Sequence, residues 1–182
     1  ASLANLMTME LVFHSLRTGE HSLNDVIHIS ENAWRTGGSS SGGSTMFAKL
    51  DSDIKLDDLI RAVIVQSAND ACIAIAEAYS GSEELFAKAM TERAKAIGLT
   101  KSEFKNSTGL PADGQHVTMR DLANLGRHIW KEYPEFYPIY SQREFEWNKI
   151  KQRNRNPLLA MDIGADGMKT GFTEESGYAI VG

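Results

Sequence analysis

Three short polar clusters contain the residue types that acyl transfer by a serine nucleophile requires. They are Ser2–Asn5 (Ser-Leu-Ala-Asn), Ser67–Asn69 (Ser-Ala-Asn) and Lys169–Gly171 (Lys-Thr-Gly). A serine in the first turn of a helix lies near unpaired backbone N–H groups and the positive end of the helix dipole, which stabilise developing negative charge. A residue three positions later lies one turn along on the same face, where a lysine of lowered pKa would take the serine proton. The spacing therefore makes Ser2 the candidate nucleophile and position 5 the place of its general base.

The other two clusters offer groups for relaying a proton and for holding a peptide. Ser67 and Asn69 would bring a hydroxyl and an amide to the side of a cleft. A lysine and a threonine on an edge strand would offer a positive charge and a hydroxyl to a substrate carboxylate, and the glycine after them would let an extended ligand approach the backbone closely. Each cluster alone is more typical of a helix cap or a strand end. The interpretation therefore depends on their order and on the chain between them, which is long enough for a helical subdomain.

Hydrophobic spacing predicts the elements that must position these clusters. Helices are expected over residues 2–18, 56–66, 71–79 and 83–97 and from Thr118 to before Pro134, with Ser2, Ser82 and Thr118 at their starts. Extended segments are expected over residues 25–30, 145–147, 167–171 and 176–181, the last two as an antiparallel hairpin. Residues 37–44, rich in Gly and Ser, are expected to form a polar loop outside the core.

The order of these elements indicates the fold class. Helices in the middle of the chain and strands toward its end are typical of an α+β protein rather than an alternating parallel one. Two or three strands alone would make a marginal sheet. We therefore expect residues 1–182 to be a single domain, a helical subdomain with an antiparallel sheet, that lacks outer strands at both ends.

Composition argues against several other classes of protein. A net charge of −5 disfavours a nucleic-acid binder, and we interpret the basic run Lys149–Arg155 as a solvated loop. The one cysteine, Cys72, lies in an apolar run where a buried thiol is expected, and it excludes an intramolecular disulfide. The five histidines include no His-Glu-x-x-His pair, so neither a metal nor another cofactor is predicted. No apolar run is long enough to span a bilayer.

Compared segment by segment, the chain resembles the low-molecular-weight D-alanyl-D-alanine carboxypeptidases, penicillin-binding serine peptidases of the β-lactamase and transpeptidase-like superfamily. The signature of that superfamily is Ser-x-x-Lys, Ser-Asp-Asn and Lys-Thr-Gly, which the three clusters resemble in the same order. The similarity extends along nearly the whole chain. The matching segments are residues 1–8, 44–47, 59–72, 106–110, 118–122, 154–159, 166–173 and 176–178.

The resemblance implies a role for each residue of the first two clusters. Ser2 would attack the carbonyl carbon of a terminal D-Ala-D-Ala peptide bond and form an acyl-enzyme that water then hydrolyses. Ser67 would relay protons, and Asn69 would line the cleft beside it. β-Lactam antibiotics would acylate the same serine as substrate mimics, and peptidoglycan stem peptides would be the natural partners.

The resemblance also implies that the third cluster and the residue after it bind the substrate. Lys169 and Thr170 would hold the terminal carboxylate, Gly171 would allow close approach, and the backbone N–H groups of Ser2 and Phe172 would form the oxyanion hole. The implied setting is the periplasm or the outer face of the cytoplasmic membrane. Any membrane anchor would lie beyond this chain, and the signal segment would have been removed.

Asn5 departs from the family pattern. The family has lysine at this position, whereas an amide has no group that accepts a proton at neutral pH. The loss of a general base costs about 10² to 10⁴ in rate. The chain is therefore expected to bind β-lactams and D-Ala-D-Ala peptides weakly and to acylate slowly. A non-catalytic penicillin- or peptidoglycan-binding module, in which Asn5 marks lost activity, is the alternative from another class.

A class A β-lactamase is a further and less favoured alternative. It would need a deacylating glutamate on a loop between the second and third clusters. Glu132 and Glu135 lie in that interval, but the Tyr-Pro pairs around them do not resemble that loop. Turnover of nitrocefin would distinguish this activity from a carboxypeptidase.

Overall fold

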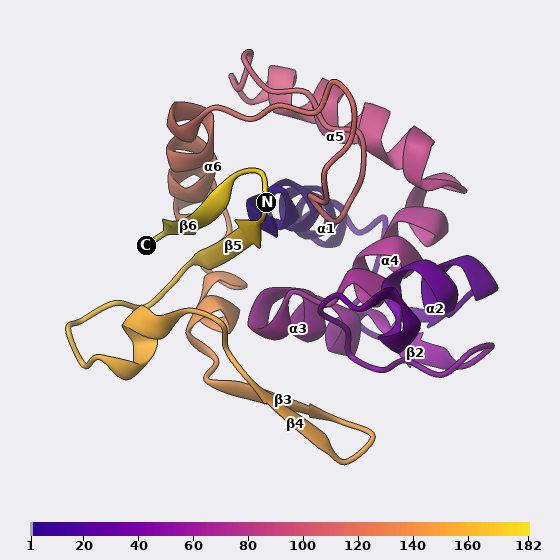
Figure 1. The fold of residues 1–182 in the computed structure, drawn as a ribbon. Coiled ribbons are helices and arrows are strands. Elements are labelled where there is room, and N and C mark those ends of the chain that lie inside the picture. The colour runs from indigo at the N-terminus through magenta and orange to yellow at the C-terminus, as the bar shows by residue number, and fades with distance from the viewer. Residues whose placement is uncertain (1) are drawn as a thin grey trace.

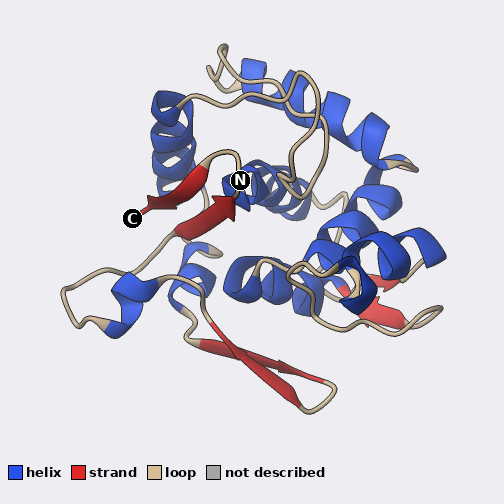
Figure 2. Ribbon diagram, viewed as in Figure 1, coloured by secondary structure: helices blue, strands red, loops and turns tan. Residues whose placement is uncertain are grey.

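A computed structural model describes residues 2–182, and of Ser2 it describes the backbone only. Figure 2 shows helices and short strands in one body, which confirms the α+β class. The helices are α1 Asn5–Arg17, α2 Glu31–Gly37, α3 Leu56–Gln66, α4 Asn69–Ser80, α5 Glu83–Ala96 and α6 Met119–Glu132, with 3₁₀ turns η1 Ser2–Ala4, η2 Ser39–Ser41, η3 Tyr137–Ser141 and η4 Pro157–Ala160. Three antiparallel strand pairs join β1 Val26–His28 to β2 Asp53–Lys55, β3 Glu144–Trp147 to β4 Ile150–Arg153, and β5 Lys169–Thr173 to β6 Gly177–Val181.

Helix α1 lies in the middle of the molecule and contacts α3, α5 and α6 (Figure 1). Its side chains from Leu6 to Phe13 are almost all buried, so the helix has no wide solvent face. The β5–β6 hairpin lies beside the N-terminus and packs on η1, the turn that precedes α1 (Figure 1). The first and third clusters, which are far apart in the sequence, are therefore neighbours in the fold.

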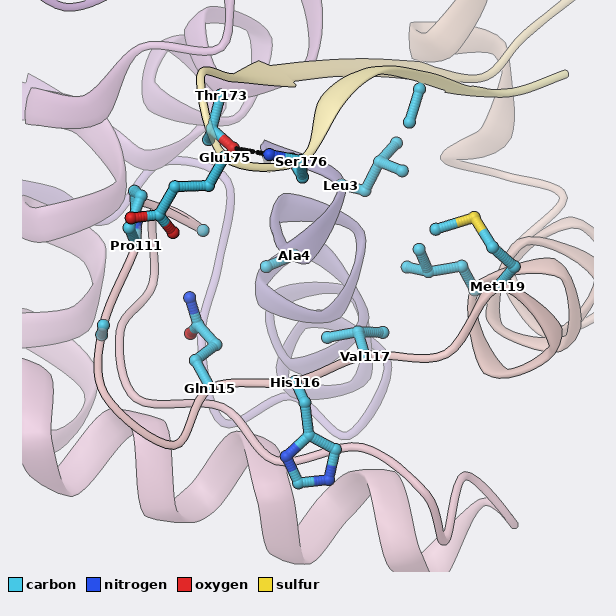
Figure 3. A pocket seen from close by; sticks show the side chains of 14 residues that line it. Leu3, Ala4, Pro111, Gln115, His116, Val117, Met119, Thr173, Glu175 and Ser176 are labelled. Atoms are coloured by element: carbon cyan, nitrogen blue, oxygen red, sulfur yellow. Dashed lines mark hydrogen bonds between the residues drawn. The ribbon is translucent and has the colours of Figure 1, made fainter.

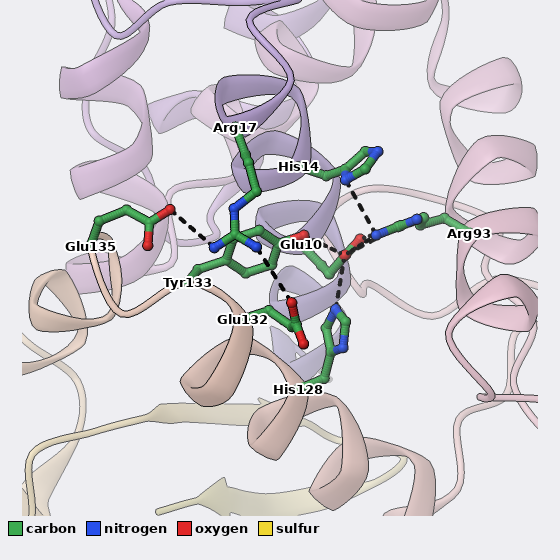
Figure 4. A network of polar contacts seen from close by, with 8 residues as sticks. All are labelled: Glu10, His14, Arg17, Arg93, His128, Glu132, Tyr133 and Glu135. Carbon is green, nitrogen blue, oxygen red and sulfur yellow. Dashed lines mark hydrogen bonds and ion pairs between the residues drawn. The ribbon is translucent and has the colours of Figure 1, made fainter.

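A fully buried carboxylate, Glu10, holds α1 to α5 and α6 (Figure 4). Arg93 on α5 donates to it from Nη2 at 2.9 Å and from Nε at 3.1 Å, and the Tyr133 hydroxyl donates at 2.8 Å. His128 Nε2 lies 3.1 Å from the same carboxylate. Burial alone would raise the pKa of Glu10, but the hydrogen bonds from Arg93, Tyr133 and His128 outweigh it and hold the pKa below its usual range.

Several predicted elements have the expected limits. Helix α3 covers the predicted residues 56–66. Helix α5 begins after Ser82, whose hydroxyl accepts from Leu85 N at 3.2 Å, and α6 begins after Thr118, whose hydroxyl accepts from Asp121 N at 3.1 Å. These hydrogen bonds confirm both predicted N-caps. An N-cap could be predicted from the sequence because it depends only on residues three positions apart.

The prediction that Ser2 begins the first helix was wrong. Residues 2–4 form the tighter turn η1, and α1 begins at Asn5 with Ala4 as an N-cap that offers no side-chain hydrogen bond. Short 3₁₀ turns are common where a helix begins. The second correction concerns α4, which begins at Asn69 rather than at residue 71. Ser67, in a left-handed conformation with φ 56° and ψ 40°, separates it from α3.

One helix, α2, and two strands, β2 and β4, were not predicted. Helix α2 has only seven residues, and Gly37 at its end is buried rather than part of an outer loop. A Cβ on Gly37 would lie 2.5 Å from Asp70 N, so only glycine allows α2 to pack this closely on α4. Strand β4 lies in the basic run that we interpreted as a loop. It follows β3 through Asn148 and Lys149, whose φ values of 47° and 63° are typical of a type I′ hairpin turn.

Candidate active site

The structure brings the second and third clusters into direct contact. Lys169, the first residue of β5, is 2% exposed, and its Nζ donates to Ser67 Oγ and, at 2.8 Å, to Thr170 O. Ser67 is also buried, at the left-handed junction between α3 and α4. Burial lowers the pKa of Lys169 to about 8. A substantial part of this lysine is therefore neutral at mildly alkaline pH.

The first cluster lies beside this pair. The backbone of Ser2 belongs to η1, which packs against β5. Leu3 and Ala4, from the same turn, line one pocket together with Thr173 and Ala179 of the β5–β6 hairpin. The side chain of Ser2 lies outside the described residues, so its role as the nucleophile stays a prediction.

Asn5 is 1% exposed, and its amide is already engaged. With its nitrogen turned toward the loop after α5, the amide donates to Thr108 O at 3.0 Å and to Ser107 O at 3.1 Å. The sulfur of Cys72 lies 3.6 Å from the same end of the amide. Cys72 is buried as predicted, and burial raises the pKa of its thiol. Asn5 therefore ties α1 to residues 107–108 and provides no proton acceptor.

Asn69 lines a pocket of about 450 Å³ together with residues 42–44 of the Gly/Ser-rich segment. It is the first residue of α4, is 5% exposed, and its backbone N donates to Ser44 O at 2.9 Å. A Cβ on Gly43 would lie 2.8 Å from Asn69 Nδ2. The absence of a side chain at position 43 therefore leaves room for the Asn69 amide in this pocket.

Asp70, next to Asn69, fixes the chain that forms the far wall of the same pocket. Its buried carboxylate accepts from Thr45 Oγ1 at 2.7 Å, from Met46 N at 3.0 Å and from Ala48 N at 3.1 Å. Phe47, between the last two donors, has a φ of 61° and stays 38% exposed at the pocket. Sequence reasoning missed this apolar wall, because it depends on a left-handed residue that no local signal marks.

The predicted substrate-binding residues line a second pocket of about 590 Å³ together with Ser67. These residues are Thr170, Gly171 and Phe172. Arg155 lines both this pocket and the one at Asn69. We interpreted the basic run that contains Arg155 as a solvated loop, so the sequence analysis missed this residue as part of the site. Its place in a basic run was the one compositional signal that could have pointed to it.

The two candidates for the deacylating glutamate of a β-lactamase do not line these pockets. Glu132 and Glu135 lie on the outside of the molecule, where each is paired with the exposed Arg17 at 3.4 Å and 3.2 Å (Figure 4). Within residues 2–182 no group of three His, Cys, Asp or Glu side chains is arranged to hold a metal ion. In the same part of the chain, no helix has the length and apolar character needed to cross a membrane.

Comparisons with known proteins agree with this geometry. The family model for D-alanyl-D-alanine carboxypeptidase matches residues 1–182. The chain is 43% identical to D-alanyl-D-alanine carboxypeptidase DacC of Escherichia coli K12 over 183 aligned residues, which cover 100% of this chain and 46% of the relative. The chain thus spans about half the length of the curated relatives that it matches.

Solved structures show the same fold. Penicillin binding protein 5 from Haemophilus influenzae superposes with a TM-score of 0.92 at 41% identity, over 98% of this chain and 52% of that protein. Penicillin-binding protein D2 from Listeria monocytogenes, in an ampicillin-bound form, superposes with a TM-score of 0.81 at 30% identity, over 98% of this chain and 70% of that protein. The penicillin-binding, transpeptidase-like fold is therefore confirmed.

Proposed function

Because the chain belongs to the D-alanyl-D-alanine carboxypeptidase family of serine peptidases, we propose that the whole protein removes the terminal D-alanine from peptidoglycan stem peptides through an acyl-enzyme on Ser2. The observation that carries this proposal is the buried contact between Lys169 Nζ and Ser67 Oγ. It joins two of the three signature clusters beside η1, the turn that contains Ser2.

The reaction is an acyl transfer in two steps. Ser2 Oγ attacks the carbonyl carbon of the penultimate D-alanine, the C–N bond breaks, and the terminal D-alanine leaves with a proton on its amine. Water then cleaves the ester and restores the serine hydroxyl. Backbone N–H groups of Ser2 and Phe172 stabilise the oxyanion in both steps.

Proton transfer from Ser2 needs an acceptor other than Asn5. The neutral form of Lys169 is such an acceptor, because its Nζ already contacts Ser67 Oγ and its pKa is lowered to about 8. The proton of Ser2 would pass to Ser67 as the Ser67 proton passes to Lys169. This route replaces the missing base at position 5 only in part, since the lysine acts through a second hydroxyl.

If Lys169 accepts the proton, other groups must bind the terminal carboxylate of the substrate. Lys169 donates to Ser67 and to a backbone carbonyl, so we assign the carboxylate contacts to Arg155 and Thr170, which line the pocket of about 590 Å³. Gly171 leaves room for the ligand backbone on the same strand. An exposed guanidinium presents a forked donor set that fits a carboxylate.

β-Lactams are proposed as acylating inhibitors of the same serine. The ampicillin-bound form of the Listeria monocytogenes relative supports this proposal. A peptidoglycan substrate also implies a location outside the cytoplasm, in the periplasm or at the outer face of the cytoplasmic membrane. A non-catalytic penicillin-binding module is the second candidate, favoured by the engaged Asn5 amide.

Intact-protein mass spectrometry after incubation with benzylpenicillin tests these alternatives. We expect the native chain to acylate slowly, Asn5→Lys to acylate about 10² to 10⁴ times faster, and Ser2→Ala to give no adduct. Rapid and complete acylation of the native chain would contradict the impairment by Asn5. Penicillin binding without an adduct in either the native chain or Asn5→Lys would favour the non-catalytic module. No binding and no adduct would contradict the proposed function.

A further inference from the structure

Gln152, on strand β4, lies on the inward face of the β3–β4 hairpin. Its neighbours Lys151 and Arg153 are exposed, whereas Gln152 is half-buried. Across the hairpin it pairs with Phe145, which is buried. Successive side chains of a strand point to opposite faces, so Gln152 turns toward the body of the molecule. There it lines the pocket at Asn69.

The Gln152 amide joins two walls of the cleft. Its Nε2 donates to Thr45 O at 2.8 Å, and its Oε1 accepts from Arg155 Nη2 at 2.9 Å. These partners fix the orientation of the amide, because a reversed amide would turn its oxygen to an acceptor and its nitrogen to a donor. Thr45 in turn donates from Oγ1 to the buried carboxylate of Asp70 at 2.7 Å. A chain of hydrogen bonds therefore runs from Asp70 on α4 to the guanidinium of Arg155.

The side chain of Arg155 has little else to hold it. Its backbone N donates to Val65 O at 3.1 Å, which places the main chain, but the residue is exposed. Within residues 2–182, the contact with Gln152 is the one side-chain hydrogen bond that Arg155 makes. A free arginine side chain has many rotamers, and immobilising it on a ligand opposes binding. Gln152 therefore removes part of this entropic cost before a ligand enters.

A neutral acceptor orients Arg155 without cancelling its charge. Among the described residues that line the pockets at Ser67 and Asn69, Arg155 is the single charged one. A carboxylate at position 152 would form an ion pair with Arg155 and compete with an anionic ligand. The amide oxygen instead engages only part of the donor set of the guanidinium. The remaining N–H groups and the whole positive charge stay available to a carboxylate.

We propose that Gln152 is a positioning residue that aims the Arg155 guanidinium at the terminal carboxylate of the substrate. The inference rests on the proposed function, which assigns that carboxylate to Arg155. Gln152 acts through Arg155 and does not bind the carboxylate itself. Removing the Gln152 amide should therefore weaken the binding of ligands that carry a carboxylate and leave the binding of ligands without one nearly unchanged.

Two synthetic peptides test the proposal by NMR titration. One is Nα,Nε-diacetyl-L-Lys-D-Ala-D-Ala, with a free C-terminal carboxylate, and the other is its C-terminal amide. We expect the native chain to prefer the carboxylate. Gln152→Met, which keeps the length of the side chain but has no amide, should lower this preference about threefold to tenfold, the range for ordering one more long side chain on binding. Gln152→Glu should lower it further, because its charge pairs with Arg155.

A double-mutant cycle separates positioning from a general structural role. In the Arg155→Ala background, Gln152→Met should have no further effect on the ratio of the two affinities. Gln142→Met is the matched control, and it should keep the native ratio. Gln142 is also half-buried, donates to Glu144 O at 2.9 Å and accepts from Arg61. It lines neither the pocket at Ser67 nor the pocket at Asn69.

Two results would overturn the inference and leave the proposed acyl transfer intact. One is an unchanged ratio of affinities in Gln152→Met, and the other is an effect of Gln152→Met on this ratio that persists in Arg155→Ala. Equal binding of both peptides by the native chain would refute the assignment of the carboxylate to Arg155, and the inference with it. Failure of both peptides to bind the native chain would overturn the proposed function and the inference together.

Discussion

Acylation by a penicillin is expected to become about tenfold faster between pH 7 and pH 9 if neutral Lys169 takes the proton through Ser67. Burial lowers the pKa of Lys169 to about 8. The neutral amine then makes up about a tenth of the molecules at pH 7 and about nine tenths at pH 9. Because only the neutral amine accepts a proton, the rate follows this fraction.

The assay is the rate of acylation by a fluorescent penicillin at fixed concentration, measured between about pH 6.5 and pH 9.5. Lys169→Arg keeps a positive charge that is not lost in this range, so we expect a flat profile and a rate about 10² lower. The Asn5→Lys variant should be acylated faster than the native chain, and the midpoint of its rate-against-pH profile should lie at a lower pH. A second ammonium group beside Cys72, which both side chains approach, disfavours the charged form of Lys169.

The opposite pH profile would refute this reasoning. If protonated Lys169 holds the substrate carboxylate, the rate should stay level or fall as the pH rises from 7 to 9, because the positive charge is lost. A level or falling profile in the native chain would therefore exclude Lys169 as the proton acceptor. Circular dichroism at each pH shows whether the fold persists over the range.

Two further outcomes follow from the described contacts. Glu10→Gln should lower the free energy of unfolding at pH 7 by about 2 kcal/mol, since it replaces charge-assisted hydrogen bonds with neutral ones. Because the pKa of Glu10 is lowered on folding, this stabilisation is present above about pH 4.5 and is lost as the pH falls below it. Urea unfolding of the native chain and of Glu10→Gln, at pH 7 and below about pH 4.5, measures this difference in the free energy of unfolding. Equal unfolding midpoints for the two proteins at pH 7 would contradict the prediction. Phe47→Ala should slow acylation by benzylpenicillin about threefold to tenfold more than acylation by 6-aminopenicillanic acid, whose lack of an aromatic group leaves nothing to contact this wall. Equal slowing would assign Phe47 a structural role only.

The elements that could be predicted are those with local causes. The caps at Ser82 and Thr118 and the limits of α3 depend on residues within one helical turn. Helix α2 could not be found this way, because seven residues are marginal in isolation and its stability comes from packing Gly37 on Asp70. Strand β4 was hidden for a related reason: its charged side chains are exposed on a hairpin, so they carry no apolar pattern.

The site divides in the same way. The family resemblance implied that Ser67 and Lys169 both belong to one substrate cleft, because a family pattern carries long-range information, but it did not predict their direct contact. Arg155 could not be predicted, since its place in the cleft is set by a backbone bond to Val65 O at 3.1 Å, far away in the sequence. The pocket lined by Ala4 and Glu175 could not be predicted either, because it forms where the β5–β6 turn approaches the loop around Pro111 (Figure 3).

Asn5 separates two tasks that a lysine at the same position would perform together. A buried lysine can donate to backbone carbonyls and, when neutral, accept a proton. The Asn5 amide performs the first task through Ser107 O and Thr108 O, and this keeps the loop after α5 attached to α1. It has no means of performing the second. The cleft at Ser67 and Arg155 would therefore keep its shape and its charges, while the proposed reaction would lose the base at position 5. Ligand binding in this chain should accordingly be affected far less than the rate of acylation.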